Sequence, residues 1–331
     1  MSDSKMEYVR LGRTGLRVSR LGLGAMGMGN PAWRPWVLSE EASKPIIFRA
    51  LDLGINFFDT SNYYSAGASE EILGRVLLPA LPRDEIVVAT KVGNPMGKGP
   101  NARGYGRKHI IRAVDESLRR LNTSYIDLYQ THIWSNDAPL EETVEAFDTL
   151  VRAGKVLHVG ITTMPAWQLA RALGIAERDG RVPFASVQNH YNLVYREDER
   201  DMIPLCRAEG LGLIPFSPMA RGFLAGDRPT IGGGPTMRAR TDEYCHKWYY
   251  RPGDLSIAAR TGEVAARYGV KPAQIGLAWT LAKQGITAPI FGATTPDQVD
   301  AAVAALSIRL EPADMAYLEE PYEPRWGEVL G

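Results

Sequence analysis

Four titratable side chains stand at or just after the ends of predicted β-strands. Asp59 ends the segment Asn56–Asp59, Tyr64 follows in the next loop, Lys91 ends Ile86–Lys91 and His132 ends Ile126–His132. A tyrosine is a weak acid with a pKa near ~10. A neighbouring ammonium lowers that pKa, and a carboxylate keeps a buried ammonium charged. Together with an imidazole that orients a carbonyl, the set suits protonation of the alkoxide that hydride attack on a carbonyl leaves behind.

Each of the four residues alone also has an ordinary structural interpretation. A strand-end aspartate often caps a loop, Tyr64 stands beside Tyr63 in an aromatic loop, and most lysines are solvated. Four such residues on successive strand ends are hard to explain by coincidence. A different chemistry also exists for Lys91, since barrel aldolases use a strand-end lysine as a Schiff-base nucleophile. That lysine must be neutral, which a neighbouring carboxylate at Asp59 opposes.

The strands that would position these residues are short β-rich runs that alternate with helical patterns. Besides Asn56–Asp59, Ile86–Lys91 and Ile126–His132, they are Leu21–Leu23, Val156–Thr162, Ser186–Asn189, Leu213–Phe216 and Ala288–Phe291. Between them, apolar residues recur at helical spacing, and glycines stand where the helices should end. These are Gly54, Gly154, Gly180, Gly210 and Gly269. Eight strands that alternate with helices predict parallel pairing.

Two architectures with parallel strands compete, a closed barrel and an open doubly wound sheet. No G-x-G-x-x-G follows the first strand, which counts against a dinucleotide-binding open sheet. The sequence therefore predicts a (β/α)8 TIM barrel, in which catalytic residues lie at the carboxyl ends of the strands. The opening segment predicts a β-hairpin around Gly12 and Gly15, and Gly226–Gly253 predicts a long loop after the seventh strand. With no evident linker, residues 1–331 are interpreted as a single barrel domain.

Composition excludes several other classes of protein. Lys plus Arg and Asp plus Glu number 38 each, so no overall field attracts nucleic acid or an anionic membrane. No apolar run reaches the ~20 residues that span a bilayer. The two cysteines, Cys206 and Cys245, form no C-x-x-C pair, which favours the reducing cytoplasm. Cys206 is expected in the core, and an exposed, reactive thiol is the less favoured option for Cys245. The five histidines show no zinc-binding spacing, so no metal site is expected.

Beyond these patterns, the chain resembles the aldo-keto reductases, with the bacterial-type, NAD(P)H-dependent members as the reference. NFFDTSNYYSAGASEEILGRVL is similar to the segment that holds the family's Asp and Tyr, and IVVATKVG to its Lys strand. The segment that begins YIDLYQTHIWSND resembles the family's His strand together with the next helix and the fifth strand. VQNHYNLVYR, IPFSPMARGFLAG and PIFGATTPDQVDAAVAAL resemble the sixth, seventh and eighth strand regions. The similarity covers almost the whole chain in order.

The resemblance implies a role for each matching residue. Asp59, Tyr64, Lys91 and His132 match the catalytic tetrad, with Tyr64 as the acid in reduction. The implied cofactor-binding residues are Gly24, Met26, Asp59, Thr162, Gln188, Phe216, Ser217, Met219, Arg221, Gly292, Thr294 and Gln298. Among them, Gln188 matches the residue that holds the nicotinamide carboxamide, and Phe216 the aromatic residue that stacks on the ring. Thr295 to Gln298 also has the T-x-x-Q form of a capping box, with proline at the first helical position.

The resemblance implies a nicotinamide cofactor, but the residues leave the choice between NADP(H) and NAD(H) open. Family habit favours NADP(H), yet no Lys or Arg stands between Lys283 and Arg309, where many relatives bind the 2′-phosphate. Ala302 replaces an expected asparagine, and Thr162 and Thr163 replace a common Ser-Asn pair. Arg221 and Gln298 are candidates to compensate. NADP(H) is therefore favoured and NAD(H) is possible.

The substrate is expected to be a small-molecule carbonyl compound with a bulky or apolar group. Trp33, Tyr64, His132 and Trp134 are the predicted substrate-pocket residues. Further aromatic residues gather on the same predicted loops, namely Trp36, Tyr63, Trp248, Tyr249 and Tyr250. A further alternative comes from relatives that serve as regulatory subunits of potassium channels and turn over slowly. The physiological substrate, the favoured direction and the oligomeric state are not determined by the sequence.

Overall fold

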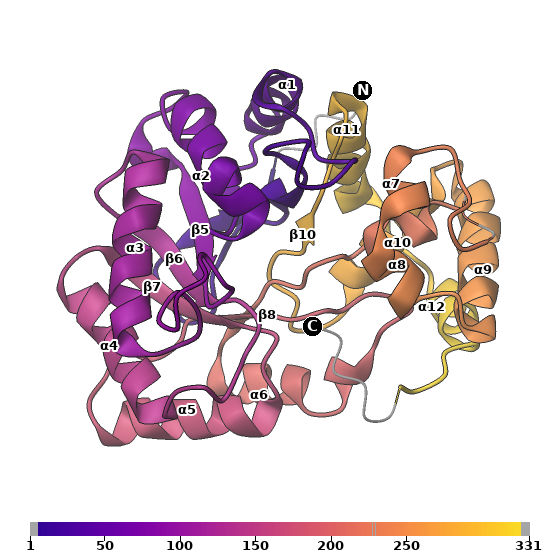
Figure 1. The fold of residues 1–331 in the computed structure, drawn as a ribbon. Coiled ribbons are helices and arrows are strands. Elements are labelled where there is room, and N and C mark those ends of the chain that lie inside the picture. The colour runs from indigo at the N-terminus through magenta and orange to yellow at the C-terminus, as the bar shows by residue number, and fades with distance from the viewer. Residues whose placement is uncertain (1–5, 227, 229, 326–331) are drawn as a thin grey trace.

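The computed structural model describes residues 6–226, 228 and 230–325, and its centre is a curled sheet of eight parallel strands. The order in the sheet is β10-β3-β4-β5-β6-β7-β8-β9. Figure 1 labels β5 to β8 and β10 of these strands. The bounds are Gly22–Gly24 (β3), Phe57–Asp59 (β4), Val87–Val92 (β5), Ile126–Thr131 (β6), Val156–Thr162 (β7), Ser186–Gln188 (β8), Gly212–Leu213 (β9) and Ile290–Phe291 (β10). All eight predicted strands are present, and the predicted (β/α)8 barrel is confirmed.

The barrel closes between β9 and β10, the two shortest strands. Parallel bridges join Leu213 to Ile286 and Phe216 to Ile290, and the amide of Ile290 donates to the carbonyl of Pro215 at 2.8 Å. On its other side, β10 pairs with β3 through Ile290 and Phe291. These contacts complete the ring of strands and set the ends of β9 and β10 next to each other.

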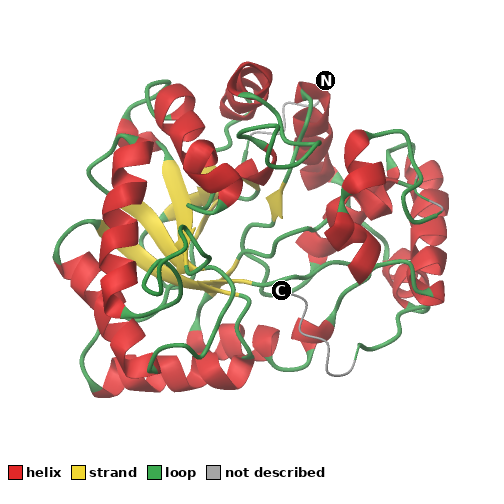
Figure 2. Ribbon diagram, viewed as in Figure 1, coloured by secondary structure: helices red, strands yellow, loops and turns green. Residues whose placement is uncertain are grey.

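Helices surround the strands on the outside (Figure 2). They are α1 (Glu40–Asp52), α2 (Ala68–Ile72), α3 (Arg107–Leu121), α4 (Leu140–Arg152), α5 (Ala166–Arg178), α6 (Met202–Glu209), α9 (Pro252–Tyr268), α10 (Pro272–Ala282), α11 (Pro296–Ala304) and α12 (Pro312–Glu319). The predicted stop glycines follow α1, α4, α5, α6 and α9, each with positive φ. Glycine is favoured there because a side chain disfavours the left-handed conformation that ends a helix. In the described part of the chain, no helix has the length and apolarity needed to cross a membrane.

The predicted N-terminal hairpin is formed by β1 (Tyr8–Arg10) and β2 (Arg17–Ser19). Its buried side chains, Leu11 and Val18, join a core cluster with Phe57 and Val87 from the first positions of β4 and β5. Gly12 is required at the turn, because a Cβ there would lie 2.6 Å from the amide nitrogen of Gly212. The hairpin therefore covers the end of the barrel where the strands begin and leaves the opposite end free.

The long connection between β9 and α9, which spans residues 214–251, contains more regular structure in its described part than the predicted loop. It contains the 3-10 helix η6 (Ala220–Ala225) and the short helices α7 (Met237–Thr241) and α8 (Glu243–Trp248). The sequence analysis missed α7 and α8 because each is too short to show an apolar period. Their starts are fixed by capping, since Thr236 Oγ1 accepts from the Ala239 amide at 3.1 Å and Asp242 Oδ1 from the Cys245 amide at 3.3 Å. Both helices appear at the right of Figure 1, and α8 contacts η6, which in turn contacts α9 and α10.

Candidate active site

The four residues predicted to form the catalytic set meet at the open end of the barrel. Asp59 ends β4, Lys91 lies in β5, Tyr64 begins a short 3-10 helix after β4, and His132 follows β6. Lys91 Nζ donates to Asp59 Oδ1 at 2.6 Å and lies 5.1 Å from the centre of the Tyr64 ring. The rings of Tyr64 and His132 are 5.5 Å apart between centroids and nearly perpendicular. The four side chains come together because the parallel strands of a barrel have their carboxyl ends at the same end of the barrel.

The backbone after Tyr64 has an unusual conformation that directs the chain into α2. Ser65 and Ala66 have φ values of 51° and 54°, and Gly67 has 99°. Non-glycine residues in such conformations cost on the order of 1–3 kcal/mol each. The fold tolerates this strain where it holds Tyr64 above Lys91.

Burial and the ion pair set the protonation states of Lys91 and Tyr64. Burial alone would lower the pKa of Lys91, but Asp59 and Tyr64 together raise it above the ordinary lysine value, so the ammonium is charged. Burial raises the pKa of Tyr64, and Lys91 offsets only part of that rise. The ammonium thus acts in the predicted direction, although burial has the larger effect, and the phenol stays protonated at neutral pH. A charged Lys91 that is fully buried is unsuited to the Schiff-base alternative.

Asp59 is the centre of a hydrogen-bond network that draws on several strands. Besides the contact with Lys91, its Oδ2 accepts from Gln188 Nε2 of β8 at 2.9 Å and from Gln130 Nε2 of β6 at 3.3 Å. Lys91 Nζ also donates to the carbonyl oxygen of Thr60 at 2.8 Å. A buried carboxylate is stable only when its oxygens are so paired. The network therefore fixes the position of the ammonium under Tyr64.

His132 is held by contacts to both its ring and its backbone. Its Nδ1 lies 2.9 Å from Asn94 Nδ2 and 3.1 Å from Ser61 Oγ. Its backbone amide donates to the hydroxyl of Tyr105 at 3.1 Å, and that hydroxyl donates to the carbonyl of Ile133 at 2.6 Å. Burial, followed by the charge of Lys91, lowers the pKa of His132 well below the ordinary histidine value. The imidazole is therefore neutral at physiological pH.

A cavity of about 710 Å³ extends from this catalytic set along the carboxyl ends of β8, β9 and β10. Its lining includes every residue that the sequence analysis assigned to the cofactor: Gly24, Met26, Asp59, Thr162, Gln188, Phe216, Ser217, Met219, Arg221, Gly292, Thr294 and Gln298. Tyr64 and His132 line one end, and Lys91 lies below the surface with no exposure. The volume lies within the range of small-molecule sites.

The predicted substrate residues divide into two groups. Trp33 lines the cavity and contacts two tyrosines of the loop after β4. Its ring centroid lies 5.9 Å from that of Tyr63 and 6.4 Å from that of Tyr64. Trp134 is not among the lining residues, so its predicted place in the pocket is wrong. Its ring stacks on Tyr105 at 5.0 Å, and its Nε1 donates to Asn136 at 3.0 Å. The sequence placed Trp134 on the correct loop, but it could not show that Tyr105 would hold the side chain outside the cavity.

Thr162 and Arg221 each place on the cavity wall a polar atom without a hydrogen-bond partner within the described structure. Thr162 Oγ1 and Arg221 Nη2 are buried and make no hydrogen bond there. Buried polar groups are normally satisfied, so such atoms point to a polar ligand. Phe216 has one ring face covered by His190, with a centroid distance of 5.2 Å and an interplanar angle of 11°. The residue also lines the cavity, as an aromatic wall for a flat ring.

The structure adds cationic residues that the sequence analysis missed. Arg238 of α7 and Lys271, which precedes α10, line the same cavity as Gly292 and Thr294. Arg238 shares the carboxylate of Asp242 with Arg221, at 3.0 Å from Arg238 Nε and 2.8 Å from Arg221 Nε. One carboxylate thus contacts two guanidinium groups, and this lowers the pKa of Asp242 to about 2 against the effect of burial. The excess positive charge favours an anionic ligand.

The loop after β3 and the β9–α9 connection meet over this cavity. The guanidinium of Arg238 lies 4.5 Å from the ring centre of Trp36, and that of Arg34 lies 5.7 Å from the same ring. Arg34 also lies 5.0 Å from the ring centre of Tyr244 in α8. These cation–π contacts join the two segments. The predicted clustering of Trp36 near the mouth is confirmed.

The predicted capping box at the start of α11 is not formed. Thr295 occupies the N-cap and Pro296 the first helical position, but the Thr295 side chain makes no capping hydrogen bond. Gln298 instead accepts with its Oε1 from the Thr294 amide at 2.7 Å. The side chain therefore orders the turn that lines the cavity, one residue earlier than predicted.

Both cysteines are buried, and neither forms a disulfide bond. Cys206 lies in the core, as predicted. Cys245 is also buried, in α8, and the considered option of an exposed thiol is wrong. Burial raises the pKa of both thiols. Within the described residues, no cluster of three His, Cys, Asp or Glu side chains is placed to bind a metal ion.

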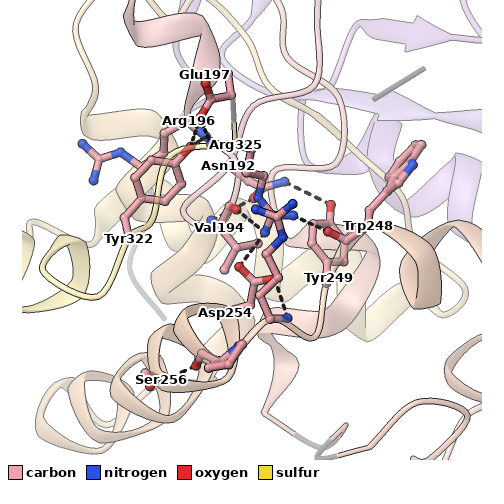
Figure 3. Close-up of polar contacts among 12 residues, drawn as sticks. Asn192, Val194, Arg196, Glu197, Trp248, Tyr249, Asp254, Ser256, Tyr322 and Arg325 are labelled. Carbon is pink, nitrogen blue, oxygen red and sulfur yellow. Dashed lines mark hydrogen bonds and ion pairs between the residues drawn. The ribbon is translucent and has the colours of Figure 1, made fainter. Parts of the chain in front are cut away.

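Arg325, at the end of the described chain, anchors the far side of the β9–α9 connection (Figure 3). It is 2% exposed, and its guanidinium donates to the carbonyls of Trp248 and Val194 and to Asp254 Oδ1. Trp248 lines the cavity, and the next residue, Tyr249, shares a 2.7 Å hydrogen bond with His190 Nε2. Arg325 is thus linked to Phe216 through Trp248, Tyr249 and His190, whose ring stacks on Phe216.

The comparisons with known proteins agree with this fold. A model of the aldo/keto reductase family matches residues 20–323, and the chain belongs to that family of oxidoreductases. The versiconal hemiacetal acetate reductase of Aspergillus parasiticus is 41% identical over 97% of this chain and 98% of its own length. An aldo-keto reductase of Metarhizium robertsii is 39% identical, covering 98% of this chain and 93% of its own. A putative aryl-alcohol dehydrogenase of Schizosaccharomyces pombe is 38% identical over 96% of each chain.

Proposed function

We propose that the protein reduces an aldehyde or ketone to an alcohol with NAD(P)H, with Tyr64 as the general acid. The observation that carries the proposal is the place of Tyr64. Its ring lies against Lys91, which is paired with Asp59, and faces His132 at the end of a long cavity.

The four side chains have distinct tasks in this reaction. Tyr64, protonated at neutral pH, gives its hydroxyl proton to the carbonyl oxygen as the oxygen gains charge. Lys91 stabilises the phenolate that forms, and Asp59 keeps Lys91 charged and in place. His132, which is neutral, donates a hydrogen bond to the same oxygen and orients the carbonyl group. Proton transfer from a positioned acid contributes about 10²–10⁴-fold to a rate.

The lining of the cavity supports the proposal that it binds a nicotinamide dinucleotide. Thr162 Oγ1 and the carbonyl oxygen of the Gln188 side chain are available to the carboxamide, and Phe216 offers an aromatic face to the ring. Arg221 and the turn at Thr294 would hold phosphate and adenosine groups. When bound, the reduced nicotinamide supplies the hydride.

The cationic residues at the far end of the cavity favour NADP(H) over NAD(H). The eighth strand region carries no Lys or Arg of its own, but Arg238 and Lys271 line the same cavity as Gly292 and Thr294. Arg238 Nη1 lies 3.7 Å from the place that a Cβ on Gly292 would take. A guanidinium is well suited to bind a 2′-phosphate. The test is Arg238→Met, which should raise the KM for NADPH at least about tenfold and leave that for NADH nearly unchanged. An equal rise for both cofactors would mean that Arg238 does not recognise the 2′-phosphate.

A bulky or aromatic carbonyl compound is the proposed substrate. Trp33 and Tyr63 line the cavity next to Tyr64, and Trp36 lines it beside Arg238; all three offer apolar faces. The names of two relatives, an aryl-alcohol dehydrogenase and a hemiacetal acetate reductase, refer to compounds of compatible chemistry. No observation favours the channel-subunit alternative.

Tyr64→Phe tests the proposed reaction. The variant should bind NADPH with unchanged affinity, measured by fluorescence titration, and lose about 10²–10⁴-fold in kcat on a panel of aromatic ketones and aldehydes. Tyr125→Phe is the matched control. Tyr125 precedes β6, at the opposite end of the barrel, where its ring contacts Arg83. Wild-type kcat in Tyr64→Phe, or equal losses in both variants, would contradict the role of Tyr64.

A further inference from the structure

We propose that Asn94 and Ser61 are positioning residues that fix the tautomer of His132, so that its ring hydrogen resides on Nε2. The inference rests on the proposed carbonyl reduction and adds two residues to it. Asn94 follows β5 by two positions, and Ser61 follows β4 by two, so each lies beside a strand that carries a catalytic residue. Both contact the same atom of His132, the ring nitrogen Nδ1.

The contact with Asn94 determines the direction of the hydrogen bond. The nitrogen of a side-chain amide has hydrogens to donate and cannot accept. Since Asn94 Nδ2 lies 2.9 Å from His132 Nδ1, that ring nitrogen must be the acceptor. A neutral imidazole has one hydrogen, so an accepting Nδ1 places that hydrogen on Nε2.

The contact with Ser61 is compatible with the same assignment. Its Oγ accepts a hydrogen bond from the backbone amide of Tyr63 at 3.1 Å. The hydroxyl hydrogen is then available to His132 Nδ1, which lies 3.1 Å away. If Nδ1 carried the hydrogen, Asn94 Nδ2 would be left without its acceptor, whereas the Ser61 hydroxyl can rotate either to donate or to accept. Asn94 therefore decides the tautomer, and Ser61 adds a second donor once Nδ1 is the acceptor.

The surroundings of His132 also disfavour the doubly protonated ring. The ring is buried beside the positive Lys91, and no carboxylate of the described residues forms a hydrogen bond or ion pair with it. The hydroxyl of Tyr105 accepts from the backbone amide of His132 and forms no hydrogen bond with the ring. His132 therefore presents a neutral N–H beside Tyr64.

The consequence for the reaction is a pair of donors on one carbonyl oxygen. With hydrogen on Nε2, His132 and the Tyr64 hydroxyl both donate to the oxygen, one to orient it and one to protonate it. With hydrogen on Nδ1, the lone pair of Nε2 would repel that oxygen. The tautomer thus decides whether His132 assists the substrate or opposes it.

The tautomer is directly measurable in the full-length protein labelled with ¹⁵N-histidine. Long-range ¹H–¹⁵N correlation spectra distinguish the two neutral forms and the imidazolium, and the spectrum of His132→Gln identifies the signals of His132. We expect the Nε2–H form near neutral pH. An Nδ1–H form or an imidazolium in the wild-type protein would overturn the proposal.

Two variants test whether Asn94 and Ser61 cause this state. Asn94→Asp replaces a donor by an acceptor, so the ring should change to the Nδ1–H form or the imidazolium, and kcat should fall at least about tenfold with less change in KM. The double variant Asn94→Ala with Ser61→Ala should show both neutral forms. Asn30→Asp adds the same charge to an exposed loop position, where Asn30 Oδ1 accepts from the Ala32 amide, and should leave spectrum and kcat unchanged.

The outcomes separate this inference from the proposed function. If the His132 spectrum of Asn94→Asp and of the double variant equals that of the wild type, the tautomer is set by something else and the proposal fails. Carbonyl reduction that depends on Tyr64 would still stand in that case. If Tyr64→Phe retains full kcat, the proposed function fails, whatever the tautomer of His132.

Discussion

The side-chain amide of Gln188 donates to the carboxylate of Asp59 at 2.9 Å, so that one contact joins the wall of the cavity to the buried ion pair of Asp59 and Lys91. The same carboxylate holds Lys91 through its other oxygen. Gln188 therefore has its nitrogen directed at Asp59 and its oxygen available for a ligand. Changes at Gln188 are expected to alter both cofactor binding and catalysis.

Gln188→Glu should place a second carboxylate against Asp59 and oppose its ionisation. We expect cofactor affinity and kcat/KM each to fall at least about tenfold, with partial recovery on acidification as the new carboxyl takes up a proton. Steady-state kinetics between neutral and mildly acidic pH would show this. Gln284→Glu, at an exposed position, is the control. A loss that does not depend on pH would argue against like-charge repulsion.

Lys91→Met should strongly destabilise the fold, because it leaves the Asp59 carboxylate buried without its counter-ion. Such a loss costs about 3–5 kcal/mol. Adding Asp59→Asn removes the stranded charge and should recover most of the unfolding free energy, while activity stays lost. Urea unfolding of the wild type, both single variants and the double variant measures the coupling. If the two single losses simply add in the double variant, the ion pair is not coupled as described.

The neutral state of His132 predicts a specific dependence of stability on pH. Its pKa is lowered well below the ordinary value of ~6.5 by burial and then by Lys91. Below about pH 6.5 the unfolded chain binds a proton that the folded chain excludes, so the free energy of unfolding falls as pH decreases. His132→Gln should reduce this slope by up to about 1.4 kcal/mol per pH unit, measured by urea unfolding at several pH values. Parallel slopes would show that His132 is already charged in the folded protein.

Arg325→Met should weaken cofactor binding through the β9–α9 connection. The substitution removes the donors to Trp248 and Val194 and leaves Asp254 buried without its partner. We expect a lower Tm and a dissociation constant for NADPH raised about tenfold, equivalent to ~1.4 kcal/mol. Arg309→Met is the control, since its guanidinium contacts carbonyls of its own turn. Unchanged NADPH affinity with a lowered Tm would restrict Arg325 to a role in stability.

The sequence predicted the parts of this protein that follow from local pattern. Strands such as Val156–Thr162 have β-rich composition between helical periods, and each residue of the predicted catalytic set lies at or soon after a strand end that the barrel brings to the mouth. Arg238 and Asn94 were missed because nothing local marks them. The first gains its place when α7 folds back over the cavity, and the second when β5 sets its loop beside His132. Trp134, in contrast, was predicted to line the pocket and does not. Its ring stacks instead on Tyr105, which is 29 positions away in the chain, so no local pattern could indicate that contact.

The closure of the barrel has a consequence for how the molecule opens. The ring of strands is thinnest where two-residue strands and isolated bridges join Leu213 and Phe216 to Ile286 and Ile290. We expect amide hydrogens there to exchange with deuterium before those of β5 to β7. The proposed cofactor site extends from Phe216 to Gly292, across the junction between β9 and β10. A bound dinucleotide would therefore hold the two strands together. Protection from exchange would then increase most at the weakest join of the sheet.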